Sequence, residues 1–395
     1  MFDSELRKLA DAGSAEHQWK LSQAYREAGR VARASRYFRR AIEQGYPAAI
    51  TYQIEQWTAA AGEFGNFSAA HKLLDKYPDL HELDSWRWRL GVISGLFDKA
   101  RDMESAREQY RAGNPEALRY VALRCSFAGM DEQAIALLSR AAVAGDSWSQ
   151  RILDPNAIAD LPVLAAGGES PVALSDRDWQ SAFTDPGAVK EEDLAIEPRV
   201  YLCRGWLPLL GCRLLATAAQ PELKPSLVYD AQSGRQIEST FRTSHSMTFM
   251  PWLIDPSIAY IQRRLAQHCG MSPGQCEVLG LLRYEPGQAY KLHYDAFDPN
   301  QPGVGDMLRD GGQRIRTALV YLNSGFHGGE TRMENLDLEV KGESGDLLVF
   351  DNVDAQGQRH PDSLHAGKPV VSGSKWLLSQ WYREGGTHFT QQMSW

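Results

Sequence analysis

The sequence predicts an α+β protein of two domains, with an all-α helical-repeat solenoid followed by a β-rich domain. The chain has 395 residues, which exceeds the length of one ordinary domain. Residues 1–153 are rich in alanine and place apolar residues three and four positions apart, as amphipathic helices do. Residues 172–395 contain short apolar and β-branched runs between turn-forming residues. Segment 154–171, which contains prolines and glycines, is expected to link the two domains.

The N-terminal part contains an internal repeat. Residues 12–29 (AGSAEHQWKLSQAYREAG) align with residues 112–129 (AGNPEALRYVALRCSFAG), and a second amphipathic run ending at glycine follows each. Related starts at Gly45 and Ala144 fit a unit of roughly 34 residues, and a degenerate unit is expected over residues 80–111. The segment resembles tetratricopeptide (TPR) or Sel1-like repeats, which usually present a concave surface to a peptide or partner. An unrelated helical bundle is the alternative.

The C-terminal part has six runs that are typical of strands. One helix is expected among them, over residues 256–269, with an arginine-rich outer face. Many short strands with few helices are typical of a barrel or sandwich. The six runs are VYLCRGW, PSLVYD, CEVLGLLRY, TALVYLN, DLLVF and KWLLSQWY.

Composition and charge exclude several classes of function. A formal net charge of -8 argues against a general affinity for nucleic acid or anionic membranes. We expect no secretory signal, because the N-terminus has no apolar stretch, and no membrane span, because the apolar runs are short. The five cysteines form no CxxC pair, so we expect reduced thiols, a cytoplasmic location and no structural zinc bound through sulfur.

One short spacing in the C-terminal part carries a candidate metal site. His293 and Asp295 stand one residue apart in LLRYEPGQAYKLHYDAF, so they share a face if the segment is a strand. They are either an exposed polar pair or two ligands of one ion. A third ligand is available about seventy residues later, from His360 or His365. Two histidines and one carboxylate are the ligand set of non-haem Fe(II) oxygenases, which leaves three coordination positions open.

A lysine on an apolar strand adds a second component. Lys375 follows His365 by ten residues in the run KWLLSQW, where an unpaired buried ammonium would be costly. The distal carboxylate of a 2-oxo acid would relieve that cost, while the acid itself would chelate the metal. Lys368 is the alternative, but it lies in the preceding loop and is less suited to burial.

The order of motifs in this region is specific. HYD, RIRTALVYLN, GGET, GDLLVF, a later histidine and GSKW follow one another as in the 2-oxoglutarate/Fe(II) dioxygenase superfamily. The details resemble its prolyl 4-hydroxylase branch, the catalytic domain of the α subunit, from about residue 198 to 384, including the motif Arg242-Thr243-Ser244. The resemblance implies a double-stranded β-helix (jelly-roll) dioxygenase domain over residues 172–395, with its core at 275–385.

The resemblance also implies roles for matching residues. His293, Asp295 and His365 would bind iron; the context of His365, with Gly367, Pro369 and Val370 after it, favours it over His360. Lys375 would pair with 2-oxoglutarate. Tyr284, Tyr290 and Tyr321 would contact the co-substrate or line the pocket, and Ser379 and Trp381 would flank it. Core packing is the alternative for the tyrosines and Trp381, and Thr331 in GGET is read as a turn residue. Fe(II), 2-oxoglutarate, O2 and L-ascorbate are the implied cofactors.

The function expected from these features is hydroxylation of prolyl residues in a protein or peptide, with decarboxylation of 2-oxoglutarate to succinate. The helical repeats would recruit that substrate. The chain has RMENLD after GGET, where the branch often has an apolar residue and proline, so the acceptor stays open. The alternatives are the same chemistry on a small molecule or free amino acid, or an inactive interaction scaffold. Residues 302–312 are expected to form a lid or substrate loop, or a plain surface loop.

Overall fold

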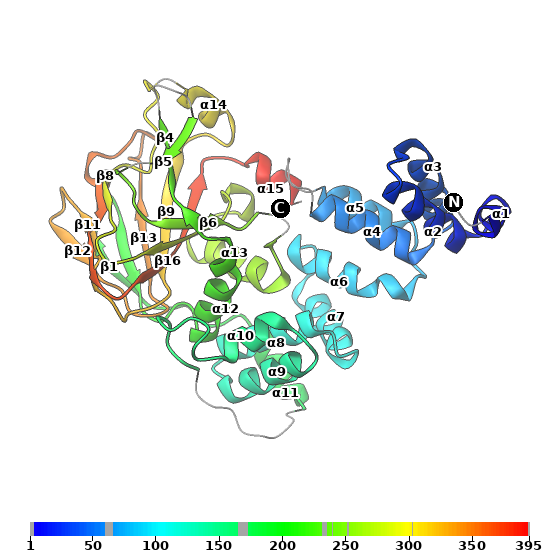
Figure 1. Ribbon diagram of the computed structural model, residues 1–395. Coiled ribbons are helices and arrows are strands. Elements are labelled where there is room, and N and C mark those ends of the chain that lie inside the picture. Colours follow the sequence, from blue (N-terminus) through cyan, green and yellow to red (C-terminus); the bar gives the residue numbers. More distant parts are fainter. Residues whose placement is uncertain are drawn as a thin grey trace.

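The computed structural model describes residues 4–393 apart from 60–65, 165–172, 231–234, 239, 251–252 and 302. The N-terminal half is helical and the C-terminal half is rich in strands, as the sequence predicts (Figure 1). All five cysteines are buried free thiols. Among the described residues, no helix has both the length and the apolar character needed to cross a membrane.

The helical half repeats a helix–glycine–helix pattern. The aligned segments at residues 12–29 and 112–129 form α2 and α8, and each packs against the next helix, α3 or α9. Glycines with positive φ end these helices at the same spacing in both stretches, at Gly13, Gly29 and Gly45 and again at Gly113, Gly129 and Gly145. The helices are α1 (Ser4–Asp11), α2 (Ala15–Glu27), α3 (Val31–Glu43), α4 (Pro47–Thr58), α5 (Phe67–Asp75), α6 (Asp84–Ile93), α7 (Lys99–Arg111), α8 (Pro115–Phe127), α9 (Asp131–Val143) and α10 (Ser147–Leu153).

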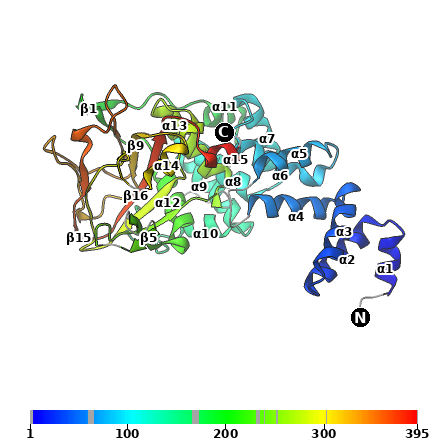
Figure 2. The ribbon, with the colours of Figure 1, turned by 90° about the horizontal axis from the view of Figure 1, so that it is seen from above.

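The first three helices have a small core of their own. Leu21 and Tyr25 of α2 pack with Ala34 and Tyr37 of α3 and with Ala10 of α1. Seen from above, these helices extend away from the β-rich half (Figure 2). Helices α6 and α7 fill the stretch in which a degenerate repeat was expected.

The β-rich half contains one large and one small sheet. All six predicted strand runs contribute strands to these sheets or to the separate β4–β5 hairpin. The large sheet has the order β1 (Glu191–Ala195), β2 (Val200–Cys203), β13 (Leu347–Asp351), β9 (Arg314–Tyr321), β16 (Lys375–Arg383), β7 (Gly280–Tyr284), β6 (His245–Thr248) and β3 (Lys224–Pro225). The small sheet has the order β12 (Leu338–Val340), β11 (Thr331–Met333), β14 (His365–Gly367) and β8 (Tyr290–His293). Two pairs complete this half, β10 (His327–Gly328) with β15 (Val370–Ser372) and β4 (Leu227–Asp230) with β5 (Arg235–Glu238).

The large sheet is buried on both faces, which explains its nearly continuous apolar runs. Leu319 and Leu377 point into a core shared with Met333 and Val340 of the small sheet. Their neighbours along the same strands belong to a second core, which includes α12, α13 and helices α4 to α10 of the helical half. Side chains that alternate across a strand therefore serve two different cores. One face of the large sheet packs against the small sheet, opposite β8 and β14. A functional site can form between these two sheets.

The β-rich half contains more helix than the sequence indicates. Only the helix at residues 256–269 is expected, and it forms α13 (Pro256–His268). Helix α12 (Leu209–Ala219) was missed because it is buried on every side from Leu210 to Ala219 and so has no polar stripe. The others are α11 (Asp176–Phe183), α14 (Val304–Arg309) and α15 (His388–Gln392), with short 3-10 turns at His81–Leu83, Gln220–Glu222, Pro273–Gln275 and Pro361–Ser363.

The prediction that the arginine-rich face of α13 points outward is wrong. Its arginines lie against the helical half, where Arg263 donates a hydrogen bond to the Ile93 carbonyl at 2.8 Å. The guanidinium of Arg264 lies 4.6 Å from the ring centre of Phe127. The sequence predicts that these arginines face solvent, because the residues that contact them come from a distant segment of the chain. They help to join the two halves instead.

The junction between the halves contains a buried ion-pair cluster. Arg119 of α8 donates to Asp255 at 2.9 and 3.2 Å and also pairs with Asp146. The two aspartates are the N-caps of α13 and α10, so one guanidinium neutralises both helix starts. Close by, Arg213 donates to carbonyls of residues 152, 154 and 162, which fixes the first part of the predicted linker. Residues 165–171 of that linker lie outside the described residues.

An Arg119→Met protein is expected to lose about 3–5 kcal/mol of unfolding free energy, because the buried Asp255 and the partly buried Asp146 lose the cation that they share. Urea unfolding measures the change. Arg199→Met is the matched control, since Arg199 forms its ion pairs with Glu191 and Asp193 at the surface and should cost no more than about 1 kcal/mol. Equal losses in the two variants would contradict the role of the junction.

Candidate metal and co-substrate site

Three potential metal ligands meet where the small sheet ends. Strand β8 pairs with β14 so that His293 lies directly opposite His365. Asp295 follows just beyond β8, and its two carboxylate oxygens lie 3.6 Å from Nε2 of His293 and 3.6 Å from Nε2 of His365. Within the described residues, these three form the one group of histidine, cysteine and carboxylate side chains whose donor atoms all lie within 4.8 Å.

Both histidines are held in the tautomer that a metal needs. Nδ1 of His293 lies 2.8 Å from the carbonyl oxygen of Lys291, and Nδ1 of His365 lies 2.9 Å from that of Ser363. A carbonyl oxygen only accepts, so each Nδ1 carries the proton and each Nε2 presents a lone pair. Tyr290 stacks on the His293 ring with centres 3.5 Å apart, which fixes the ring plane.

A hydrogen-bond chain orients the carboxylate. Thr317 of β9 donates to Asp295 at 2.7 Å, and its hydroxyl in turn accepts a hydrogen bond from Asn352 at 2.8 Å. Burial alone would raise the pKa of Asp295, but the imidazoles of His365 and His293 hold it well below the ordinary value. Burial, helped by His293, lowers the pKa of His365 to about 4. At neutral pH the group therefore offers one anionic oxygen donor and a neutral imidazole.

This donor set fits a divalent metal ion. Bonds of about 2.1 Å at angles of about 90–120° place two donors about 3.0–3.6 Å apart, which is close to the separations found. All three side chains are at least nine-tenths shielded from solvent, with exposures of 10%, 5% and 6% for His293, Asp295 and His365. His360, the alternative ligand, lies elsewhere and faces Glu197 at 3.4 Å.

A Thr317→Val protein is expected to bind Fe(II) about 10–100-fold more weakly, because Asp295 loses the donor that orients it. The shape of the side chain is nearly unchanged, so folding should be retained. Titration of metal-free protein with Fe(II) under anaerobic conditions measures the dissociation constant. An unchanged constant would show that the Thr317 hydroxyl has no part in holding the metal.

The three candidate ligands line a cavity between the two sheets. Five of the residues predicted for the co-substrate lie in its wall, namely Tyr284, Tyr290, Lys375, Ser379 and Trp381. Tyr321 is not among the lining residues. Its ring lies behind Lys375, 5.3 Å from the ammonium, and its hydroxyl bonds with Thr331 at 2.8 Å and the Val340 carbonyl at 3.2 Å. Tyr321 is therefore placed as support for the wall and does not form part of its surface.

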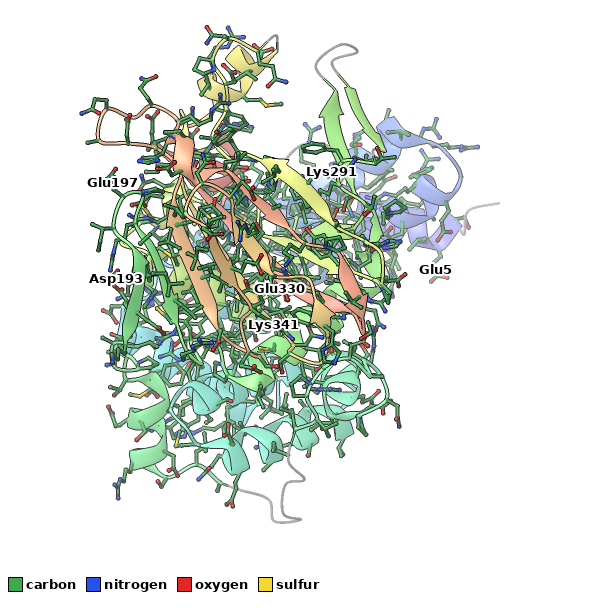
Figure 3. All side chains as sticks on the ribbon, turned by 90° about the vertical axis from the view of Figure 1, so that its left-hand side faces the viewer. Glu5, Asp193, Glu197, Lys291, Glu330 and Lys341 are labelled. Atoms are coloured by element: carbon green, nitrogen blue, oxygen red, sulfur yellow. The ribbon has the colours of Figure 1, made fainter. Side chains whose placement is uncertain are left out.

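Lys375 lies buried at the base of the cavity. It is 2% exposed and donates to the carbonyl oxygen of Gly329 at 2.8 Å. Burial lowers its pKa to about 7, although the charge of Glu330 raises it (Figure 3 shows Glu330 on the β-rich half). Lys368, the alternative, lies outside the cavity and pairs at the surface with Glu339 at 3.1 Å. Among the described residues no carboxylate forms an ion pair with Lys375, so this buried lysine is suited to an anionic ligand.

The glycines of the GGET motif shape this base. Gly328 and Gly329 both have positive φ, and a Cβ on Gly328 would lie 2.5 Å from the Pro369 carbonyl oxygen. The turn thus brings the Gly329 carbonyl to Lys375. Thr331 was read as a turn residue, which is wrong, because it is a buried residue of β11 and lines the cavity.

Sequence reasoning missed several residues of the site. Side chains two positions apart on a strand share a face, so Leu377, between Lys375 and Ser379, could have been predicted to line the cavity. The same holds for Leu319, two positions beyond Thr317 on β9. Arg242 was noted only as part of a motif, yet it lines the cavity and its guanidinium lies 5.3 Å from the ring centre of Tyr290. Nothing in the sequence indicates Asn352, because its contact depends on the pairing of β13 with β9.

The β-rich half is similar to known proteins. Residues 279–383 match the model of the 2OG-Fe(II) oxygenase superfamily. Prolyl 4-hydroxylase 1 of Arabidopsis thaliana is 33% identical over 216 residues, which cover 51% of this chain and 74% of the relative. Prolyl 4-hydroxylase 2 of the same plant is 32% identical over 222 residues, 51% of this chain and 72% of the relative.

Among solved structures, the viral collagen prolyl hydroxylase of Paramecium Bursaria Chlorella virus-1 is similar, with 28% identity and a TM-score of 0.36 over 47% of this chain and 94% of that one. The assignment rests on the sequence relatives, which share about a third of their residues over most of their own length. The chain belongs to the 2OG-Fe(II) oxygenase superfamily, in its prolyl 4-hydroxylase-like branch, and is a 2-oxoglutarate-dependent dioxygenase.

Proposed function

We propose that the enzyme hydroxylates prolyl residues of a peptide or protein, with His293, Asp295 and His365 as the iron ligands. The observation that carries this is one cavity whose wall contains all three ligands together with Lys375. The names of the relatives point to prolyl residues as the acceptor. One molecule each of 2-oxoglutarate and O2 would be consumed per hydroxyl group added, with release of succinate and carbon dioxide.

Each part of the cavity would have a defined task. The ligands hold Fe(II), which when bound supplies the activation of O2 and the oxidation of the acceptor. Lys375 pairs with the distal carboxylate of 2-oxoglutarate, and Tyr284 and Ser379 border that position. The apolar walls from Leu282, Leu319 and Leu377 exclude bulk water around these groups. Tyr290, Arg242 and Trp381 complete the wall that an acceptor would face.

The finer description of the fold also belongs to this proposal. The two facing sheets of residues 172–395 are what a double-stranded β-helix (jelly roll) would provide, with its core at 275–385. The recurring helix pairs of residues 1–153 support a TPR- or Sel1-like solenoid that recruits the substrate. Because Arg213 fixes residues 152–162, the boundary segment 154–171 would not act as a free hinge along its whole length.

Two further expectations remain proposals. L-ascorbate would restore iron that becomes oxidised in turnovers without substrate. A reducing, cytoplasmic environment is supported by the five unpaired thiols.

Succinate formation from 2-oxoglutarate tests the proposed function. The purified enzyme with Fe(II) and ascorbate is expected to form succinate faster in the presence of a proline-containing peptide, with a mass gain of one oxygen atom on proline. Stimulation by a free amino acid or another small molecule alone would support the first alternative. Absence of turnover with bound iron and every candidate would support the interaction scaffold.

A further inference from the structure

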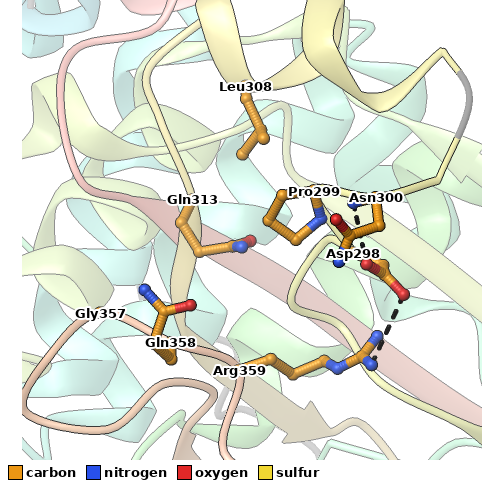
Figure 4. Close-up of a pocket in the computed structure, with 8 residues that line it drawn as sticks. All are labelled: Asp298, Pro299, Asn300, Leu308, Gln313, Gly357, Gln358 and Arg359. Carbon is orange, nitrogen blue, oxygen red and sulfur yellow. Dashed lines mark hydrogen bonds and ion pairs between the residues drawn. The ribbon is translucent and has the colours of Figure 1, made fainter.

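The two ends of strand β9 border different surroundings. Gln313, directly before the strand, lies in the wall of a cleft of about 340 Å³, together with Arg359 (Figure 4). Lys375 lies beyond the other end, because β16 pairs with β9 so that Leu377 stands opposite Tyr321, the last residue of β9. The lysine proposed to bind 2-oxoglutarate is therefore far along the strand from this cleft, and its neighbours come from another part of the chain.

The end of the sheet at Lys375 is contacted by the linker between the two halves. Asp160 lies in that linker, shortly after α10. Its carboxylate accepts a hydrogen bond from the Ser374 hydroxyl at 2.5 Å and lies 3.5 Å from the Arg283 guanidinium. Ser374 directly precedes Lys375, and Arg283 stands opposite Trp376, which directly follows it. Asp160 therefore contacts both the start of β16 and the neighbouring strand β7.

Asn323 connects the same points from within the fold. Its side-chain amide donates to the carbonyl oxygen of Asp160 at 3.1 Å and to that of Ser374 at 2.7 Å. Its side-chain oxygen accepts from the backbone N–H of Trp376 at 2.9 Å. The side chain of Asn323 is completely buried. Both chain neighbours of Lys375 are thus bonded to one buried residue, and that residue is bonded to the linker.

The linker holds Asp160 in a fixed place. Ile158 and Leu161, which flank Asp160, are buried in the core that the helical half shares with the large sheet. Arg213 of α12 donates to the carbonyl oxygens of residues 154 and 162, before and after Asp160. The segment continues directly from α10, so the position of Asp160 depends on how the helical half is seated.

The contact matters for Lys375 because the buried side chain has little room to compensate. Its ammonium lies between the rings of Tyr284 and Tyr321, 5.7 and 5.3 Å from their centres. Ser374 is only 4% exposed, so loss of the Asp160 carboxylate would leave a buried hydroxyl without its acceptor. The backbone at Ser374 would then shift, and a binding group needs to stay within about 0.5 Å of its productive position.

We propose that Asp160 is a positioning residue for 2-oxoglutarate, through which the linker and the helical half set how firmly Lys375 holds the distal carboxylate. The inference rests on the proposed pairing of Lys375 with 2-oxoglutarate and adds a control of that pairing from outside the β-rich half. Asp160 precedes residues 279–383, the part that matches the superfamily, so the catalytic core alone does not contain this control.

Two substitutions remove the two sides of the contact, Asp160→Ala and Ser374→Ala. We expect each to weaken binding of 2-oxoglutarate to the Fe(II)-loaded protein roughly 3–10-fold. The double variant should bind no more weakly than Asp160→Ala, because both changes remove the same hydrogen bond. Asp160→Asn keeps an oxygen that can accept from Ser374 and should recover most of the affinity. Calorimetric titration with 2-oxoglutarate in the absence of oxygen measures the dissociation constants.

Asp154→Ala is the matched control. Asp154 is an exposed aspartate of the same linker, and its carboxylate accepts from the backbone N–H of Asn156 at 2.9 Å. This variant should bind 2-oxoglutarate as the unsubstituted protein does. Titration with Fe(II) and thermal unfolding are measured on every variant. A loss of position at Lys375 leaves the affinity for Fe(II) unchanged, whereas general damage to the fold lowers both affinities.

The outcomes separate this inference from the proposed function. It is overturned if Asp160→Ala binds 2-oxoglutarate as tightly as Asp154→Ala does, or if its affinity for Fe(II) falls by the same factor. Lys375→Met is titrated alongside. Normal binding of 2-oxoglutarate to Lys375→Met overturns the assigned role of the lysine and this inference with it. Weak binding to Lys375→Met with normal binding to Asp160→Ala overturns only the control through the linker.

Discussion

A His293→Ala protein is expected to bind Fe(II) at least a hundredfold more weakly and to form almost no succinate from 2-oxoglutarate. Removing the imidazole leaves Asp295 and His365 in their 3.6 Å contact but takes away one of the three donor atoms that would hold the metal. Loss of a direct ligand should exceed the 10–100-fold loss typical of residues that only orient ligands. Metal content by atomic absorption and succinate release by mass spectrometry measure both effects.

His360→Ala is the matched control for that variant. His360 is also buried, 8% exposed, but its Nε2 faces Glu197 and its Nδ1 accepts from the backbone N–H of Asp362. It should keep its iron and its turnover. Full turnover in His293→Ala, or an equal loss in His360→Ala, would remove the basis for the assigned ligand set.

A Lys375→Met protein is expected to need roughly 30–5,000-fold more 2-oxoglutarate for half-maximal turnover, because truncating one partner of a buried charged pair costs about 2–5 kcal/mol. The distal carboxylate would otherwise enter a wall made by Tyr284, Leu377 and Ser379 without a cation. Lys368→Met, which removes a surface lysine paired with Glu339 and Glu330, should change this requirement less than about fivefold. Equal requirements in the two variants would contradict the role of Lys375.

The same lysine sets a pH dependence with a definite sign. Burial lowers the pKa of Lys375 from 10.5 to about 7 in the protein without 2-oxoglutarate. Above pH 7 the group is increasingly neutral, so the affinity for the dianionic co-substrate should fall as the pH rises. The unfolded chain keeps this proton up to its ordinary pKa, so the contribution of Lys375 to the unfolding free energy of the ligand-free protein should rise between about pH 7 and 10.5. Both slopes should be absent in Lys375→Met.

Much of the site is predictable because strands impose a period of two. The spacing of His293 and Asp295 places both on one face, and the apolar run around Lys375 predicts its burial. The six strand runs are found as predicted because each is flanked by turn residues. The choice of His365 over His360 from its local context agrees with the geometry.

Other features depend on which strands and helices become neighbours, which no local pattern contains. Thr317 and Asn352 come together only because β9 pairs with β13. Tyr321 shares a face with Leu319 and Thr317, yet its ring is covered from behind by the backbone at Gly342, where a Cβ would lie 2.3 Å from it. The buried helix α12 has no amphipathic signal, and the arginines of α13 have partners from the helical half. Tertiary contact decides each of these positions.

Anomalous diffraction at the iron edge, from crystals grown without oxygen in the presence of Fe(II) and 2-oxoglutarate, tests the central claim most directly. We expect one strong peak about 2.0–2.2 Å from Nε2 of His293, Nε2 of His365 and the Asp295 carboxylate, with the distal carboxylate of 2-oxoglutarate in contact with Nζ of Lys375. A peak bound by other residues, or 2-oxoglutarate density away from Lys375, would contradict the account.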